Sequence, residues 1–278
     1  MKELLEGKVA VVTGSGSGIG AAVTQSFLKS GVSVVATGRR MKKLERLGRH
    51  EKLELIAGDV TEPDFAADLL DTAISRFGKC DIVVNNAGVM WAGASHEIDI
   101  EHVISMVRVN IEAAFRVAHL FVRHFYKQNS GHIINTSSIL GTKVRPNAGA
   151  YSATKYAVEA LSETMRMELA ETNVKVTCVE PGLVITDLHD HFDVHPKDAS
   201  GLDEPLVPDD IARIVLEVAT QPAHVLIPKV MVLPKHSEQK YPLIMKMDIL
   251  QPLIIQILKI KLSLIHISEP TRPLYISY

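Results

Sequence analysis

The stretch Lys8–Gly20, with the sequence KVAVVTGSGSGIG, decides the fold of this chain. Its first part is a short run of valines, typical of a buried strand, and its glycines open a helical pattern over Gly18–Lys29. Glycine lets the backbone turn sharply and approach a ligand closely, while the N–H groups that start the helix attract a phosphate. This order of strand, turn and helix favours a dinucleotide site over an ordinary flexible loop.

The rest of the chain alternates short β-branched runs with amphipathic segments. We expect further strands over Val32–Thr37, Leu53–Ala57, Asp81–Asn85, His132–Thr136, Lys175–Glu180 and Lys229–Leu233. We expect helices over Pro63–Phe77, Asp99–Lys127, Tyr151–Glu171 and Pro208–Thr220. The strands are continuous apolar runs, which indicates that helices cover both of their faces. The pattern predicts an α/β protein with a single Rossmann-type, doubly wound parallel sheet of about seven strands flanked by helices.

Composition and charge argue against several other classes of protein. The chain has 278 residues, of which 46% are hydrophobic, and a formal net charge of only −2. So small a charge disfavours a nucleic-acid-binding protein, which must neutralise phosphates. Cys80 and Cys178 lie in apolar stretches, which favours buried free thiols over a disulfide. With no secretory signal and no apolar run long enough to span a membrane, we expect a cytoplasmic protein.

The end of the second strand bears on which dinucleotide is bound. NAD sites usually place a carboxylate there to hold the ribose 2′-hydroxyl. This chain instead has Arg39 and Arg40, whose guanidinium groups suit a 2′-phosphate. We therefore expect NADP as the cofactor, with NAD less favoured. The alternative is that both arginines are solvated and begin a basic helix at Met41-Lys42-Lys43.

Tyr151 and Lys155, in the sequence YSATK, are spaced to share one face of a helix. A neighbouring ammonium group lowers the pKa of a phenol, which makes a tyrosine a better base near neutral pH. Alone, such a pair could be a casual surface contact. Ser138 follows another predicted strand, however, and Asn85–Gly88 (NNAG) ends a third. Because ligands bind at the carboxyl ends of parallel strands, we expect these residues to meet at one edge.

Together, these features resemble the short-chain dehydrogenase/reductase family over nearly all of residues 7–234. The resemblance is carried by the glycine turn, Asp59-Val60, Asn85–Gly88, Asn110, Ser138, Tyr151, Lys155 and Pro181-Gly182. It implies hydride transfer between NADP(H) and an alcohol or carbonyl compound. A looser similarity, over Asn147–Met165 and Pro205–Pro234, is to the NADP-dependent 3-hydroxy acid (serine-type) and clavaldehyde dehydrogenases. That similarity suggests a small alcohol or hydroxy acid as the substrate.

The resemblance implies four catalytic residues. Tyr151 would be the general acid/base, and Ser138 would hydrogen-bond the reacting oxygen of the substrate. Lys155 would lower the pKa of Tyr151 and hold the nicotinamide ribose. Asn110 would position a water molecule that relays protons to Lys155.

The resemblance also implies the lining of the cofactor and substrate sites. The expected cofactor-binding residues are Gly14, Ser17, Gly18, Ile19, Gly20, Arg39, Arg40, Asp59, Val60, Asn86, Ala87, Gly88, Tyr151, Lys155, Pro181, Gly182, Val184 and Thr186. The expected substrate-binding residues are Ser138, Leu140, Asn147, Tyr151 and Leu183. In this family the helices predicted over Asp99–Lys127 and Tyr151–Glu171 pair across a dimer axis, so we expect a homodimer or homotetramer.

The segment Asp187–Leu206 is predicted to be a lid over the substrate. It carries no cluster of large apolar residues of the kind that a lipid pocket favours. Its three closely spaced histidines, His189, His191 and His195, are expected to belong to a solvated loop, because no further metal ligand is implied. No metal site is expected.

The residues after about 235 depart from the family. We expect 1–235 to be the complete Rossmann domain and 236–278 to be an atypical C-terminal extension. Its final part, Ser263–Pro273, resembles the translation of a sequencing adapter, so we expect the extension to be non-native. The alternative is an amphipathic helix that holds the enzyme at a membrane surface or binds a partner.

A binding protein is the main alternative to an enzyme. A dinucleotide fold could sense NADP(H) while catalysing little. Such a protein would be expected to lack Tyr151 or Lys155, and this chain has both. The sequence therefore favours an active enzyme.

Overall fold

The computed structural model describes residues 2–192, 198 and 204–235. One compact unit spans Met1–Pro234. The predicted C-terminal extension, 236–278, and most of the second half of the predicted lid lie outside the described residues. The boundary near residue 235 and the non-native origin of the extension therefore stay predictions.

The predicted doubly wound parallel sheet is confirmed. Seven parallel strands lie in the order β3-β2-β1-β4-β5-β6-β7. Their bounds are β1 Val9–Thr13, β2 Ser33–Gly38, β3 Leu53–Ala57, β4 Ile82–Asn85, β5 Gly131–Thr136, β6 Val174–Pro181 and β7 Lys229–Val232. The first strand, β1, pairs with β2 on one side and with β4 on the other, so the chain order reverses there. Ligands of such sheets bind at this reversal, beyond the carboxyl ends of the strands.

The helices also follow the sequence pattern, with one exception. Their bounds are α1 Lys2–Leu5, α2 Gly18–Lys29, α3 Met41–Leu44, α4 Phe65–Phe77, α5 Ile100–Met106, α6 Ala114–Gln128, α7 Gly149–Glu168 and α9 Pro208–Ala219. Short 3₁₀ turns are η1 Glu45–Leu47, η3 Ile139–Gly141 and η4 Asp187–His189. The exception is the regular helix predicted over Asp99–Lys127, which is interrupted by a π-helix, η2 Val107–Ala113.

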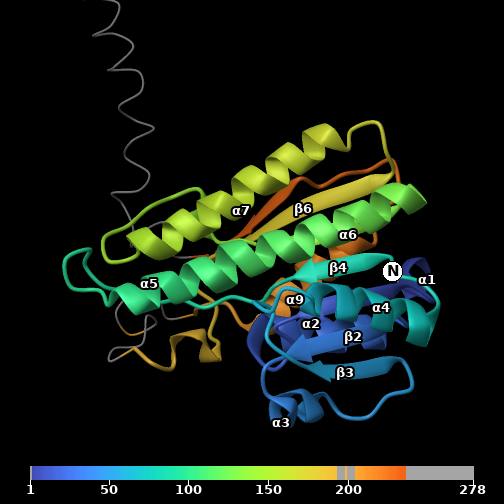
Figure 1. Ribbon diagram of the computed structural model, residues 1–278, viewed down its shortest axis with the longest axis horizontal. Helices are drawn as coiled ribbons and strands as arrows, with labels where there is room; N and C mark the ends of the chain where they lie inside the picture. The colour runs from blue at the N-terminus through green and yellow to red at the C-terminus, as the bar shows by residue number, and fades with distance from the viewer. Residues whose placement is uncertain (1, 193–197, 199–203, 236–278) are drawn as a thin grey trace, which may run out of the picture. The chain divides into compact units, whose positions relative to one another are not determined.

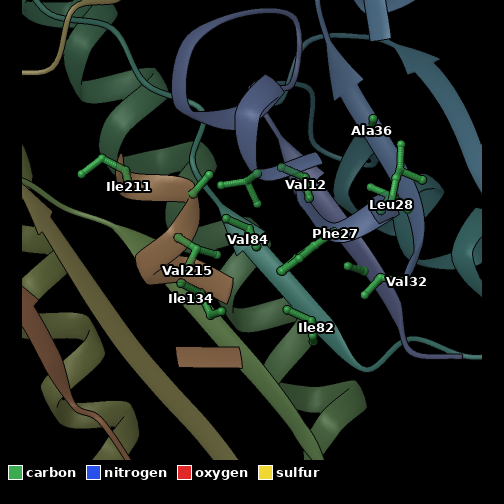
Figure 2. Packing of buried hydrophobic residues seen from close by; sticks show 14 of the residues in the cluster. Val12, Phe27, Leu28, Val32, Ala36, Ile82, Val84, Ile134, Ile211 and Val215 are labelled. Atoms are coloured by element: carbon green, nitrogen blue, oxygen red, sulfur yellow. The ribbon is translucent and has the colours of Figure 1, made fainter. Parts of the chain in front are cut away.

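Helices cover both faces of the sheet (Figure 1). An apolar core is buried between the helices and the sheet on each face. One core lies under α2 and α9, where Phe27 and Val215 pack with Val12 and Val84 of the strands (Figure 2). The other core lies under α4, α6 and α7 and includes Phe121 of α6. This double cover explains why the strand sequences are continuous apolar runs.

Cys80 and Cys178 are buried free thiols, as predicted. Within the described part of the chain, no helix is long and apolar enough to cross a membrane.

Candidate active site

The glycine turn between β1 and α2 is tightly packed because its glycines have no side chains. Gly14 and Gly18 adopt positive φ angles of 71° and 54°. A Cβ on Gly20 would lie only 2.3 Å from the carbonyl oxygen of Gly14. Ser17, the N-cap of α2, makes no capping hydrogen bond with its side chain, and the first turn of α2 has no acidic residue. The positive end of the α2 dipole therefore faces the turn with no acidic residue in the helix's own first turn, which fits the pyrophosphate of a dinucleotide.

Thr13 ties this turn to the loop after β4. Its hydroxyl oxygen accepts hydrogen bonds from the backbone N–H groups of Asn86 and Ala87, each at 2.9 Å. The Asn86 side-chain amide donates to the Thr13 carbonyl at 3.0 Å. The same amide nitrogen would lie 3.0 Å from a Cβ on Gly14. The structure thus brings two predicted cofactor-binding segments together.

The ends of β2 and β3 supply the next predicted cofactor residues. Arg39 and Arg40 are exposed, and neither guanidinium has a hydrogen-bond or ion-pair partner in the described parts of the chain. The Asp59 carboxylate accepts hydrogen bonds from the backbone and hydroxyl of Thr61, at 2.9 and 2.8 Å. Val60 packs on the core under α4. All four predicted residues lie directly beyond the carboxyl ends of their strands.

The segment after β6 completes the cofactor edge. Thr186 lies against the glycine turn, with its Cγ2 3.0 Å from the position of a Cβ on Gly18. The Thr186 hydroxyl accepts a hydrogen bond from the Leu188 N–H. Pro181 and Val184 are buried, and Gly182 is partly buried. The segment is held by a backbone hydrogen bond from Gly182 to Val232 of β7.

Tyr151, in the first turn of α7, lies next to Ser138, which follows β5. The Ser138 hydroxyl is close enough to favour the phenolate of Tyr151 and so to lower its pKa. The Ser138 hydroxyl also accepts a hydrogen bond from the Leu140 N–H at 3.1 Å. Lys155 lies one helical turn after Tyr151, with its Nζ 5.8 Å from the centre of the phenol ring. The predicted helical face shared by Tyr151 and Lys155 is confirmed.

Burial dominates the protonation of both groups. It raises the pKa of Tyr151 to about 12, against the smaller lowering effects of Ser138 and Arg145. It lowers the pKa of Lys155 to about 8. The Lys155 ammonium donates a hydrogen bond to the Thr136 carbonyl at 2.9 Å. The expected lowering of the Tyr151 pKa is therefore wrong here, because desolvation of the phenolate outweighs the nearby polar groups.

Asn110 lies in the π-helix and faces the same site. Its side-chain oxygen accepts from the Val89 N–H at 2.9 Å, and its amide nitrogen donates to the Val89 carbonyl at 2.8 Å. The amide nitrogen also contacts the Thr154 hydroxyl of α7 at 3.1 Å. A Cβ on Gly88 would lie 3.3 Å from the Asn110 side-chain oxygen and 3.8 Å from Lys155 Nζ. Helices often widen into such π turns at functional sites.

The four predicted catalytic residues are thus buried together at one edge of the sheet, around the loop after β4.

Apolar side chains surround Tyr151 on its other side. The cluster comprises Met90, Met106, Leu140 and Ala148, with the partly buried Val89, Trp91, Ile98, Ile139, Ala150, Leu188 and Phe192. Two of these, Leu188 and Phe192, come from the predicted lid. The described part of the lid therefore adds two apolar side chains to this cluster.

The other predicted substrate residues are placed differently. Asn147 is exposed, has a positive φ of 63° and accepts a hydrogen bond from Gly93 through its backbone carbonyl at 2.8 Å. Leu183 is partly buried and is not among the residues of the apolar cluster.

The lid histidines make aromatic contacts. The ring of His191 lies 4.0 Å from that of Trp91, which stacks on His102 at 3.7 Å. His189 is buried, and His195 lies outside the described residues. Where the structure describes the chain, no group of three or more potential metal ligands is found.

The sequence pattern missed one charged residue at the site. Lys43 was expected only as part of a solvated basic helix, yet its Cβ lies 3.3 Å from the position of a Cβ on Gly16. Its ammonium forms an ion pair with Asp187. No local pattern signals this contact, because the two residues are 144 positions apart.

Comparisons with known proteins agree with this geometry. A sequence profile described as short chain dehydrogenase matches residues 8–196. The chain belongs to the short-chain dehydrogenase family. An uncharacterized oxidoreductase of Staphylococcus aureus is 37% identical over 234 residues, covering 83% of this chain and 99% of the relative. The family assignment makes this chain an oxidoreductase.

Solved structures of family members superpose well on the chain. The closed form of a serine dehydrogenase complexed with NADP+ is 30% identical, with a TM-score of 0.73, and covers 81% of this chain and 94% of that one. A 3-ketoacyl-(acyl-carrier-protein) reductase from Brucella melitensis complexed with NADH is 28% identical, with a TM-score of 0.77, and covers 84% and 99%.

The tightness of the glycine turn is testable by adding one methyl group. Gly20→Ala should lower the free energy of unfolding by about 1–3 kcal/mol, since the new Cβ overlaps the Gly14 carbonyl. Gly149→Ala at the start of α7 is the matched control, because nothing lies within 4 Å of its Cβ position. Urea unfolding of both variants measures the difference, and equal stabilities would contradict the packing described here.

A buried carboxylate pair, Glu159 and Glu180, lies close to Lys155. Glu159, one turn after Lys155 on α7, and Glu180 of β6 both face Lys229 of β7, whose ammonium lies 2.9 and 3.9 Å from them. Burial, followed by the charge of Glu159, raises the pKa of Glu180 to about 7. The negative charge of Glu159 in turn raises the pKa of Lys155, against the larger lowering effect of burial.

This pair makes the stability of the protein pH-dependent. Between the ordinary value of 4.5 and about 7, folded Glu180 holds its proton more tightly than unfolded Glu180. The free energy of unfolding should therefore fall as the pH rises through this window. The Glu180→Gln variant should lose the part of this pH dependence that comes from Glu180. The Glu163→Gln variant, changed at an exposed residue of α7, should keep it. Urea unfolding across the window tests this, and parallel wild-type and Glu180→Gln curves would refute it.

Proposed function

We propose that this chain transfers a hydride between NADP(H) and an alcohol or carbonyl compound, with Tyr151 as the general acid/base. The observation that carries the proposal is the burial of Asn110, Ser138, Tyr151 and Lys155 together beside the glycine turn. Serine and tyrosine hydroxyl groups beside a lysine can hold an oxygen, exchange a proton with it and stabilise the charge left behind.

The residues present fit a dinucleotide. Gly14, Ser17, Ile19 and the start of α2 suit the pyrophosphate, and Asp59 with Val60 would flank the adenine. Asn86–Gly88 would lie under the adenosine ribose, and Thr186 would meet the carboxamide. The bound nicotinamide supplies the hydride acceptor or donor. The serine dehydrogenase and the ketoacyl reductase were solved with NADP+ and NADH respectively, so the fold is compatible with either cofactor.

The two arginines favour NADP over NAD in this chain. Arg39 and Arg40 directly follow β2. Both are exposed, and neither has a partner among the described residues, so both guanidinium groups are available to bind a phosphate. No carboxylate stands at this strand end to hold a ribose 2′-hydroxyl.

The protonation states support a simple sequence of steps. A phenol with a raised pKa is protonated at neutral pH, so Tyr151 is ready to donate to a carbonyl oxygen. Ser138 holds that oxygen within reach. Lys155, still largely ionised at neutral pH, stabilises the phenolate that remains. In the direction of alcohol oxidation, Tyr151 must first lose its proton, so that direction should be faster at high pH.

Asn110 acts as a positioning residue in this scheme. Its side chain is engaged by Val89 and Thr154, so it joins the loop after β4 to α7 close to Lys155. The water relay expected from the family stays a prediction.

The surroundings of Tyr151 favour a substrate with an apolar substituent. Leu140, Met90 and Met106 are buried beside it, and Trp91, Leu188 and Phe192 are partly buried in the same cluster. Outward apolar side chains on α5, η2, α6 and α7, including Ile104, Val107 and Tyr156, support pairing into a homodimer or homotetramer. A cytoplasmic location stays a prediction from the sequence.

Removal of the Tyr151 hydroxyl tests the assigned chemistry. Tyr151→Phe should lower kcat/KM at least about 100-fold while leaving the Kd for NADPH within about twofold, because only proton transfer is lost. The exposed Tyr156→Phe on the same helix is the control. Activity on a panel of alcohols and carbonyls with NADP(H) and NAD(H) provides the measurement. Full activity of Tyr151→Phe would refute the role of Tyr151. Tight NADPH binding with no turnover by the wild type would favour the sensing protein.

Arg39→Ala tests the choice of cofactor. It should raise the Kd for NADP+ about tenfold through loss of a charge-assisted contact, with little change for NAD+. Arg46→Ala, an exposed arginine of η1, is the control. An equal loss of affinity for both dinucleotides in a calorimetric titration would refute the assignment of Arg39 to the 2′-phosphate.

A further inference from the structure

Lys43 belongs to the glycine turn in space although it lies on α3. This short helix follows β2 and its two arginines (Figure 1). The Lys43 Cβ lies 3.3 Å from the position of a Cβ on Gly16, and a Cβ on Gly38 would lie 3.5 Å from the Gly16 N–H. The end of β2, α3 and the glycine turn therefore form one surface, which carries Arg39, Arg40 and Lys43.

Asp187, at the start of the predicted lid, is the counter-ion of Lys43. Its carboxylate accepts a hydrogen bond from the Lys43 ammonium, and the nearby Ser17 hydroxyl also lowers its pKa. The Lys43 hydrogen bond is the main cause that holds the pKa of Asp187 below its ordinary value. Asp187 is thus ionised at neutral pH, and a full negative charge lies against the glycine turn.

This arrangement has the chemistry of an anion site. Ser17 is the N-cap of α2, whose first turn contains no acidic residue of its own. A carboxylate beside a hydroxyl and an ammonium at such a helix end makes the contacts that a phosphate oxygen would make. The side chains of Lys43 and Asp187 are 21% and 44% exposed. A pair this accessible contributes little to stability and is open to exchange with an incoming anion.

We propose that Lys43 is a third cation of the 2′-phosphate site, and that Asp187 is an internal anion that competes with this phosphate for Lys43. The inference rests on the proposed function and extends it to cofactor selection. A phosphate monoester carries a charge of about −1.5 to −2 near neutral pH, more than one carboxylate, so it can displace Asp187. NAD, with a hydroxyl at this position, leaves the Lys43–Asp187 pair intact. Binding of NADP, but not of NAD, therefore breaks the Lys43–Asp187 ion pair.

Dissociation constants for NADP+ and NAD+ test this without reference to activity. Calorimetry can measure them, as can the fluorescence of Trp91, since the chain has a single tryptophan. Lys43→Ala should raise the Kd for NADP+ about tenfold and leave that for NAD+ within about twofold, because only the 2′-phosphate contact is lost. Lys43→Arg should restore most of the affinity, and the neighbouring exposed Lys42→Ala should change neither constant.

Asp187→Asn tests the competition separately. It should tighten NADP+ binding several-fold without changing the affinity for NAD+, and the gain should vanish in the Lys43→Ala background. Weaker NADP+ binding by Asp187→Asn would overturn the competition. Equal affinity losses for both dinucleotides in Lys43→Ala, or no loss, would overturn the assignment of Lys43. If the wild type bound neither dinucleotide, the proposed function itself would be wrong, and this inference would fall with it.

Discussion

Parallel hydrogen bonding of β4, β5 and β6 beside β1 is the constraint on which the site depends. Val12 pairs with Val84, Val84 with Ile134, and Ile134 with Thr177. This register aligns strands that are far apart in the chain. Because all strands point the same way, their carboxyl ends reach one edge. The glycine turn, the loop after β4, Ser138 and Thr186 become neighbours there. Both faces of the strands are buried, so a shift in register would disrupt the packing of apolar side chains on both faces.

Several buried polar groups at this edge are held by specific partners, which restrains the strands and α7 relative to one another. Asn85 donates to Asn135, and Asn135 donates to Ser162 of α7, at 3.1 and 2.8 Å. Lys155 is likewise anchored on a carbonyl of β5. Leaving such groups unpaired away from water costs about 1–3 kcal/mol each, so the helix and the strands cannot move independently. The positions of the candidate catalytic groups are therefore set by the sheet.

Charge is distributed unevenly along the same edge. Beside β2, Arg39, Arg40 and Lys43 lie near the glycine turn. Around Tyr151 the side chains are apolar and include Leu188 of the first turn of the lid. One face can therefore hold a phosphorylated nucleotide while the other excludes water from the reacting oxygen. Asp187 lies between these regions and connects the lid to the cationic side.

The sequence by itself determined the strands, the main helices, the glycine turn and the Tyr151–Lys155 face, because periodicity and backbone sterics are local properties. It also placed the four catalytic candidates, since strand ends are recognisable and parallel strands share an edge. Only the tertiary structure decided the π-helix at Asn110, the raised pKa of Tyr151, the apolar contribution of Leu188 and Phe192, and the pairing of Lys43 with Asp187. Each of these depends on burial or contact between segments distant in the chain, which no local pattern encodes.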